Sequence, residues 1–178
     1  MAANKKRAFD GLYAQLEEVN NHVVLFAAKG EPSVIFEMTN PVQQLCTDAE
    51  QYLRFQDVLS NIVQTLGEGY ALQKQDVFCK QSYHHEVPED AEFLTRSYFR
   101  YFEGREFTEI RTFLILTQEA QHSQFVQYDP KKWLDFHAKV NKVSDILSEK
   151  HIRHRMLSKE EVNEYCHRFM AFQFRHGP

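Results

Sequence analysis

The chain has 178 residues, of which 43% are hydrophobic and 26% charged, and its formal net charge is −4. This length and balance fit one soluble globular domain, and the negative charge argues against a strongly basic nucleic-acid-binding protein. The three cysteines are odd in number and widely spaced, which argues against a disulfide framework, and no apolar run reaches the roughly 18 residues of a membrane-spanning helix. We therefore expect a cytoplasmic protein.

The N-terminal part of the chain predicts a pair of strands. Residues 1–20 form a polar start and are a candidate for poor order. His22–Ala28 and Pro32–Met38 follow as two short apolar runs rich in β-branched residues, which favours buried strands. A tight turn at Gly30 would join these strands as an antiparallel pair.

The next segment predicts a helix and then a strand. Apolar residues recur at helical spacing from about Asp48 to Leu66, behind a capping box at Thr47–Glu50 and ahead of Gly67, where a C-terminal glycine cap belongs. Tyr70–Cys79 follows, with polar residues on both faces of an extended chain. This pattern indicates a strand at an edge of the sheet or on a partly wetted surface.

The second half of the chain continues the alternation of helices and strands. Helical spacing predicts a helix over Ala91–Phe102, and alternating Thr, Ile, Phe and Leu predict a strand over Phe107–Thr117. An aspartate cap followed by a first-turn proline opens a helix over Asp129–Leu147. A short strand over Ile152–Leu157 and a capping box at Ser158–Glu161 then lead into the last helix.

The predicted order of elements is ββαβαβαβα. Such alternation favours an α+β (α/β mixed) fold, in which helices pack on one or both faces of a single mixed β-sheet of about five strands. No internal repeat or linker divides the chain, so residues 1–178 are interpreted as one domain. The last residues, Ala171–Pro178, carry two phenylalanines beyond any capping signal, and we expect the domain to be a segment of a longer protein.

Motifs for nucleotide and metal binding are weak or missing in the sequence. No Gly-x-x-x-x-Gly-Lys-Ser/Thr run and no Gly-x-Gly-x-x-Gly run occurs, which argues against ATP chemistry in this segment. Two Glu-x-x-His pairs, Glu119 with His122 and Glu164 with His167, have the spacing of di-iron ligands, but that site needs a four-helix bundle. We therefore predict no metal site and no cofactor in this segment.

A small stand-alone enzyme or metal-binding protein is the alternative that the sequence leaves open. Cys79 could act as a nucleophile with His84 or His85 as its base, and Asp76 could act as a general acid or base. The apolar neighbours of Cys79 favour a packed thiol instead, and Asp76 has Lys74 on its own strand face as an ordinary ion-pair partner. A deep pocket in which Asp76, Cys79 and His84 converge would favour the enzyme.

A basic run at Lys150–Arg155 is the candidate for nucleic-acid contact. Positive side chains close together can bind DNA phosphates. Asp145 and Glu149 precede this run, however, and the overall charge is negative. We interpret the run as a solvated face and predict no direct nucleic-acid contact.

Four runs of residues resemble one family in the same order and with similar spacing. Leu-x-Lys-Gln-Asp-x-Phe, Leu72–Phe78, resembles the His-Lys-Gln-Asp-Trp-Phe signature in the N-terminal region of TraG-family conjugative transposon ATPases, relatives of the VirB-type secretion ATPases. Ser97–Phe107 resembles that family's Ser-Tyr-x-Arg-x-Phe-x-x-Arg-x-Phe segment. Leu114–Thr117 resembles its Leu-x-Leu-Thr, and Met156–Val162 its Leu-Thr-x-Glu-Glu. The similarity spans about Val23–Phe174.

The resemblance implies a non-catalytic N-terminal domain of a conjugation ATPase. In that family the ATPase motifs lie downstream, so ATP and Mg are expected only in other domains of the parent protein. The region is thought to dock the motor to inner-membrane parts of a type IV secretion channel and to assist oligomerisation. The implied partners are therefore other secretion components and a second copy, at the cytoplasmic face of the inner membrane. No catalytic residue is carried over.

One candidate interaction surface combines the polar strand with the aromatic helix that follows it. An exposed aromatic cluster suits a protein partner. The alternative is that at least half of these rings belong to the core. The residues of the candidate surface are Lys74, Asp76, Phe93, Tyr98, Phe99, Tyr101 and Phe102.

Overall fold

The computed structural model describes residues 13–19, 21–40, 49–88, 90–119 and 129–171. The strands, in chain order, are β1 (Tyr13–Val19), β2 (His22–Ala27), β3 (Pro32–Met38), β4 (Tyr70–Ser82), β5 (Glu106–Gln118) and β6 (His154–Met156). The helices are α2 (Ala49–Leu66), α3 (Phe93–Phe102), α4 (Pro130–Glu149) and α5 (Lys159–Ala171). The predicted α+β class is confirmed.

The strands form one sheet in the order β1-β2-β3-β5-β4, and β6 pairs with β3. β3 lies at the centre: it pairs with β2 at its first residues, with β5 along its length and with β6 at its last residues. Two details differ from the sequence prediction. The described sheet has six strands rather than about five, and all its pairings are antiparallel rather than mixed.

The additional strand, β1, lies within the N-terminal residues for which poor order was expected. It pairs with β2 from Val19↔His22 to Tyr13↔Ala27, and Leu16 packs against the core. Gln15, Glu17 and Glu18 interrupt the apolar residues of this stretch, so its own pattern does not identify a buried strand. Pairing with the apolar β2 supplies the stabilisation that the sequence of β1 lacks. Residues 1–12 and 20 lie outside the described part.

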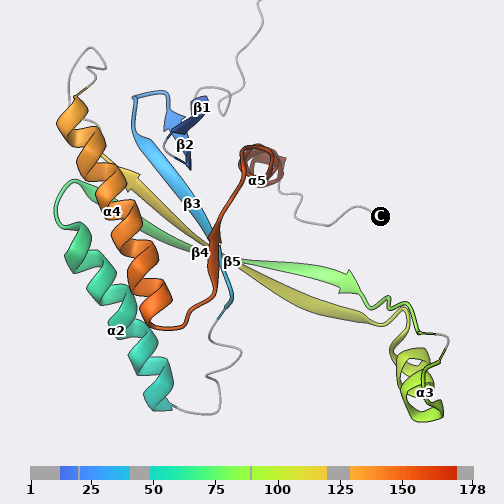
Figure 1. The fold of residues 1–178 in the computed structure, drawn as a ribbon. Helices are drawn as coiled ribbons and strands as arrows, with labels where there is room; N and C mark the ends of the chain where they lie inside the picture. The colour runs from blue at the N-terminus through green and yellow to red at the C-terminus, as the bar shows by residue number, and fades with distance from the viewer. Residues whose placement is uncertain (1–12, 20, 41–48, 89, 120–128, 172–178) are drawn as a thin grey trace, which may run out of the picture.

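Helices cover both faces of the sheet (Figure 1). α2 and α4 pack side by side on one face, and α5 packs on the other. Each face therefore has its own apolar core, which explains why β3 is buried on both sides. The fully buried side chains on the α2–α4 face include Val34, Phe36, Ile62, Leu114, Leu116, Phe136, Val140 and Leu147. Those on the α5 face include Ile35, Val77, Cys79, Phe113, Leu157 and Val162, all nearly inaccessible to solvent.

The predicted caps of α4 and α5 and the glycine at the end of α2 match the structure, whereas α3 begins two residues after the predicted Ala91 and α4 ends two residues after the predicted Leu147. Asp129 caps α4 by accepting a hydrogen bond from the backbone N–H of Lys131, at 3.0 Å. The capping box of α5 is confirmed: the backbone N–H of Ser158 donates to the Glu161 carboxylate at 2.9 Å, and the N–H of Glu161 donates to the Ser158 hydroxyl at 3.3 Å. Gly67 ends α2 with a positive φ of 68°. Thr47 and Asp48, from the first capping box, lie outside the described residues.

β4 and β5 form a hairpin much longer than the rest of the sheet. They pair without a break from Tyr70↔Gln118 to Ser82↔Glu106, over 13 residues each. Beyond the core the hairpin extends away from the body and carries α3 at its end (Figure 1). We call the described residues of 80–108, which include α3, the arm. The sequence prediction of β4 as an edge strand is confirmed, because β4 ends the strand order.

Candidate interaction surface at the end of the arm

α3 is a helix of ten residues that does not pack on the body. It begins after Glu92, whose side chain makes no capping hydrogen bond, and ends where the N–H of Glu103 donates to the carbonyl of Phe99. Gly104 then takes a positive φ of 72°, which favours glycine, and the chain turns into β5. None of the ten described residues of α3 is buried. Its stability as a helix must therefore come from contacts with the end of the hairpin.

Aromatic contacts supply this anchor. The ring of Phe99 stacks on His85, with centroids 4.3 Å apart, and Tyr83 meets Phe102 edge to face at 6.1 Å. Two backbone hydrogen bonds continue the hairpin into this region, from Tyr83 N–H to the Arg105 carbonyl and from Gly104 N–H to the Tyr83 carbonyl, both at 2.9 Å. Phe99 and Phe102, both half-buried, thus hold α3 against the strand ends.

The other side of α3 is an apolar surface open to solvent. Phe93 is 80% exposed, Leu94 76%, Tyr98 59% and Tyr101 60%. We call these four residues the α3 surface. Arg105 lies over the Tyr101 ring, 3.7 Å from its centroid, so a cation borders the rings. Contiguous exposed apolar side chains bordered by polar groups are typical of protein interaction sites.

The sequence-predicted surface therefore divides into three parts. Phe93, Tyr98 and Tyr101 are exposed on α3, whereas Phe99 and Phe102 anchor it. The remaining two predicted residues, Lys74 and Asp76, lie on β4 at least six residues before its end, about 20 Å along an extended strand. Phe93 and Leu94 lie one to two helical turns before Tyr98 and Tyr101. This spacing could have identified Leu94 from the sequence as a further residue of the surface.

Lys74 and Asp76 form an ion pair with each other on β4. Asp76 also accepts a hydrogen bond from the Thr112 hydroxyl on β5, at 2.6 Å. Partial burial opposes ionisation of Asp76, but the hydrogen bonds from Lys74 and Thr112 outweigh it and keep the pKa of this carboxyl below its usual value. Asp76 is therefore a satisfied carboxylate rather than a general acid or base poised near neutrality.

The residues of the alternative enzyme do not converge. Asp76 and Cys79 are an odd number of positions apart on β4, so their side chains lie on opposite faces of the sheet. Cys79 is buried against the α5 face, and this burial raises the pKa of its thiol. His84 lies beyond the strand and contacts the Glu103 carboxylate at 2.6 Å. A buried thiol with a raised pKa is a poor nucleophile.

The described part of the chain contains neither a cluster of metal-ligating side chains nor a helix that could span a membrane. No group of three or more His, Cys, Asp or Glu there could hold an ion. Glu164, from one Glu-x-x-His pair, forms an ion pair with Arg168 on α5, and His122, from the other, lies outside the described residues. No helix among the described residues is both long enough and apolar enough to cross a bilayer.

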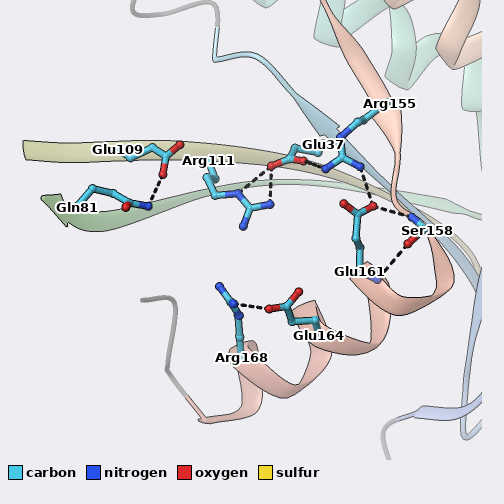
Figure 2. A network of polar contacts seen from close by, with 9 residues as sticks. All are labelled: Glu37, Gln81, Glu109, Arg111, Arg155, Ser158, Glu161, Glu164 and Arg168. Carbon is cyan, nitrogen blue, oxygen red and sulfur yellow. Dashed lines mark hydrogen bonds and ion pairs between the residues drawn. The ribbon is translucent and has the colours of Figure 1, made fainter. Parts of the chain in front are cut away.

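An ion-pair network joins the elements at the base of the arm (Figure 2). The Glu37 carboxylate on β3 accepts from Arg111 on β5, at 2.6 and 2.8 Å, and from Arg155 on β6. Arg155 also donates to Glu161 on α5 at 2.7 Å. The hydrogen bonds from Arg155 and from the Ser158 backbone lower the pKa of Glu161 to about 2. The basic run at 150–155 therefore contributes Arg155 to this network rather than to a free basic patch.

Comparison of the chain with models of known protein families, and with curated proteins, gives no match.

Proposed function

We propose that this chain is a non-catalytic docking and oligomerisation domain of a conjugation ATPase of the TraG type, which acts in DNA transfer through a type IV secretion channel. The main support for the docking role is the α3 surface. Its four large apolar side chains are exposed on a helix that has no buried residue. None of these four side chains belongs to either core of the described residues, so packing in the body does not account for them.

The positions of the four runs that resemble TraG-family sequences support the proposal that the chain belongs to that family. Leu72–Phe78 lies on β4 and Leu114–Thr117 on β5, where the two runs pair directly through Leu72↔Leu116. Ser97–Phe107 covers most of α3 and the start of β5, and Met156–Val162 joins β6 to α5. Three of the four runs therefore belong to the β4–β5 hairpin and its tip, the part of the molecule that we assign to docking.

The proposed partner is another component of the secretion channel, at the cytoplasmic face of the inner membrane. The ATP and Mg that drive transfer are assigned to other domains of the parent protein, and no catalytic residue or cofactor is assigned to this one. A parent gene that encodes a P-loop ATPase in the same reading frame is expected.

A site-specific photocrosslinker tests the docking role in cells that carry the transfer system. Placed at Leu94 on the α3 surface, it is expected to capture one defined channel component. The matched control is Gln64, an exposed position on α2. Equal crosslinking from both positions, or none from Leu94, would contradict the proposal. Leu94→Ser is expected to lower transfer frequency at unchanged protein level.

A further inference from the structure

The outer edge of β4 is a long strand edge without a neighbour. β4 has 13 residues and ends the sheet order, and within the described ranges no strand pairs with its outer side. A row of free backbone N–H and C=O groups of this length is a template for another strand. We infer that β4 pairs with β4 of a second copy, antiparallel, about a twofold axis at Gln75. This inference rests on the proposed oligomerisation role and specifies its surface.

The backbone of β4 shows which residues present hydrogen-bonding groups to that edge. Directly opposed residues of an antiparallel pair alternate between hydrogen-bonded and non-hydrogen-bonded positions. The N–H of Glu119 donates to the Gly69 carbonyl, and the N–H of Tyr83 donates to the Arg105 carbonyl, both at 2.9 Å. Odd-numbered residues of β4 therefore bond to β5, and even-numbered residues direct their backbone groups outward.

The same even-numbered residues carry a self-complementary pattern of side chains. With the axis at Gln75, Lys74 of each copy lies opposite Asp76 of the other, so two ion pairs form across the interface. Leu72 lies opposite Phe78 of the second copy, and Tyr70 lies opposite Lys80. Opposite charges and aromatic–aliphatic pairs are favourable between directly opposed residues of antiparallel strands.

Charge also disfavours the two neighbouring registers. An axis at Asp76 places this carboxylate opposite its own copy and sets Lys74 against Phe78. An axis at Lys74 places two ammonium groups opposite each other and sets Asp76 against Leu72. Like charges directly opposed across strands are destabilising, so the charges of β4 favour the Gln75 register over these two.

The pairing would also cover an exposed aromatic side chain on the body side of the arm. Phe78 is 67% exposed beside Ile110, on the face of the sheet that carries α2 and α4. In the Gln75 register it packs against Leu72 of the second copy, which is half-buried at the edge of the core. The contact is isologous, as in most twofold dimers, and uses none of the four residues of the α3 surface.

A cysteine crosslink tests the register directly. At the axis, the two Gln75 residues form a non-hydrogen-bonded pair with Cα atoms about 4.5 Å apart, within the range that a disulfide spans. Gln75→Cys in the full chain is expected to give a disulfide-linked dimer under mild oxidation. Gln73→Cys, the matched control, faces Val77 of the second copy and is expected to form no disulfide between copies. The unsubstituted chain gives the background from its native cysteines.

Charge reversal supplies an independent test by sedimentation. Lys74→Asp and Asp76→Lys each oppose like charges in a homodimer, and each is expected to weaken self-association about tenfold. An equal mixture of the two variants restores both ion pairs, and the variants are expected to associate with each other as tightly as the unsubstituted chain does with itself. Association that returns on mixing reports the restored ion pairs, because a general loss of stability in either variant would weaken the mixture as well.

The outcomes separate this inference from the docking role. A monomeric unsubstituted chain, equal crosslinking by Gln73→Cys, or a failure of the two charge variants to associate would overturn the β4 pairing, even where Leu94 still captures a channel component. Loss of capture at Leu94 with the β4 dimer intact would overturn the docking role instead.

Discussion

The body and the arm share the strands β4 and β5, yet they place large apolar side chains in opposite ways. Between Tyr70 and Cys79, β4 packs against helices on both faces, and Val77 and Cys79 are buried. Beyond Cys79, α3 at the tip is the one helix of the described residues that lies against the hairpin, and it exposes the α3 surface. This contrast shows that a segment rich in aromatic residues need not belong to the core. Whether a ring is buried depends on which element lies above it.

The largest expected effect lies in the body, at Phe136 of α4. This side chain is fully buried between α4 and the sheet, so Phe136→Ala leaves a cavity that its neighbours cannot fill. We expect a loss of about 3–5 kcal/mol in the free energy of unfolding, measured by urea denaturation. A loss below about 1 kcal/mol would show that this core is loosely packed.

The ion-pair network at the base of the arm is expected to have the next largest effect. Glu37 is half-buried and binds two arginines, so Glu37→Gln is expected to cost about 1–3 kcal/mol. Glu106→Gln is the matched change on the arm, where the pair with Lys80 is mostly exposed, and is expected to stay within about 0.5 kcal/mol. Equal effects in the same denaturation assay would remove the distinction between body and arm.

A buried histidine pair makes the stability of the body dependent on pH. The Nδ1 atoms of His22 on β2 and His137 on α4 lie 2.5 Å apart, and His22 Nε2 lies 3.0 Å from the Asn141 side-chain oxygen. Burial, with a contribution from His22, lowers the pKa of His137 below its ordinary 6.5. The unfolded chain therefore binds this proton more readily than the folded protein does.

Stability is consequently expected to be complete above pH 6.5 and to fall as the pH drops through and below that value. His137→Leu removes the titrating group, so the free energy of unfolding of this variant should depend less on pH between pH 7.5 and 5. His167→Gln, at an exposed position on α5, is the control and should follow the unsubstituted chain. Identical pH profiles for all three proteins would contradict the assignment.

The smallest expected effect on stability lies on the α3 surface. Leu94→Ser is expected to change the free energy of unfolding by less than about 0.5 kcal/mol, because the side chain is already in solvent. Phe99→Ala removes the stacking on His85 and is expected to speed hydrogen exchange of the α3 amides without changing exchange in the body. Protection of α3 that survives Phe99→Ala would show that another contact holds this helix.

Local patterns in the sequence were sufficient to predict most of the elements and their ends. The Asp129 cap, the Ser158–Glu161 capping box and the helical spacing up to Leu66 each depend on residues within one or two turns, and the structure places them as expected. The polar faces of Tyr70–Cys79 likewise indicated an edge strand. Such signals are readable because hydrogen bonding at a helix end and exposure at a sheet edge are local properties.

Features that depend on residues far apart in the sequence could be determined only from the tertiary structure. β1 became a strand through its pairing with β2, Asp76 and Cys79 were placed on opposite faces, and the rings of α3 were divided between an anchor and an exposed surface. The length of the β4–β5 hairpin beyond the core determined this last division, because none of the described helices of the body lies over the arm to bury its side chains. Whether a side chain is buried depends on the neighbours that the fold places around it, and it cannot be predicted from the residue type alone.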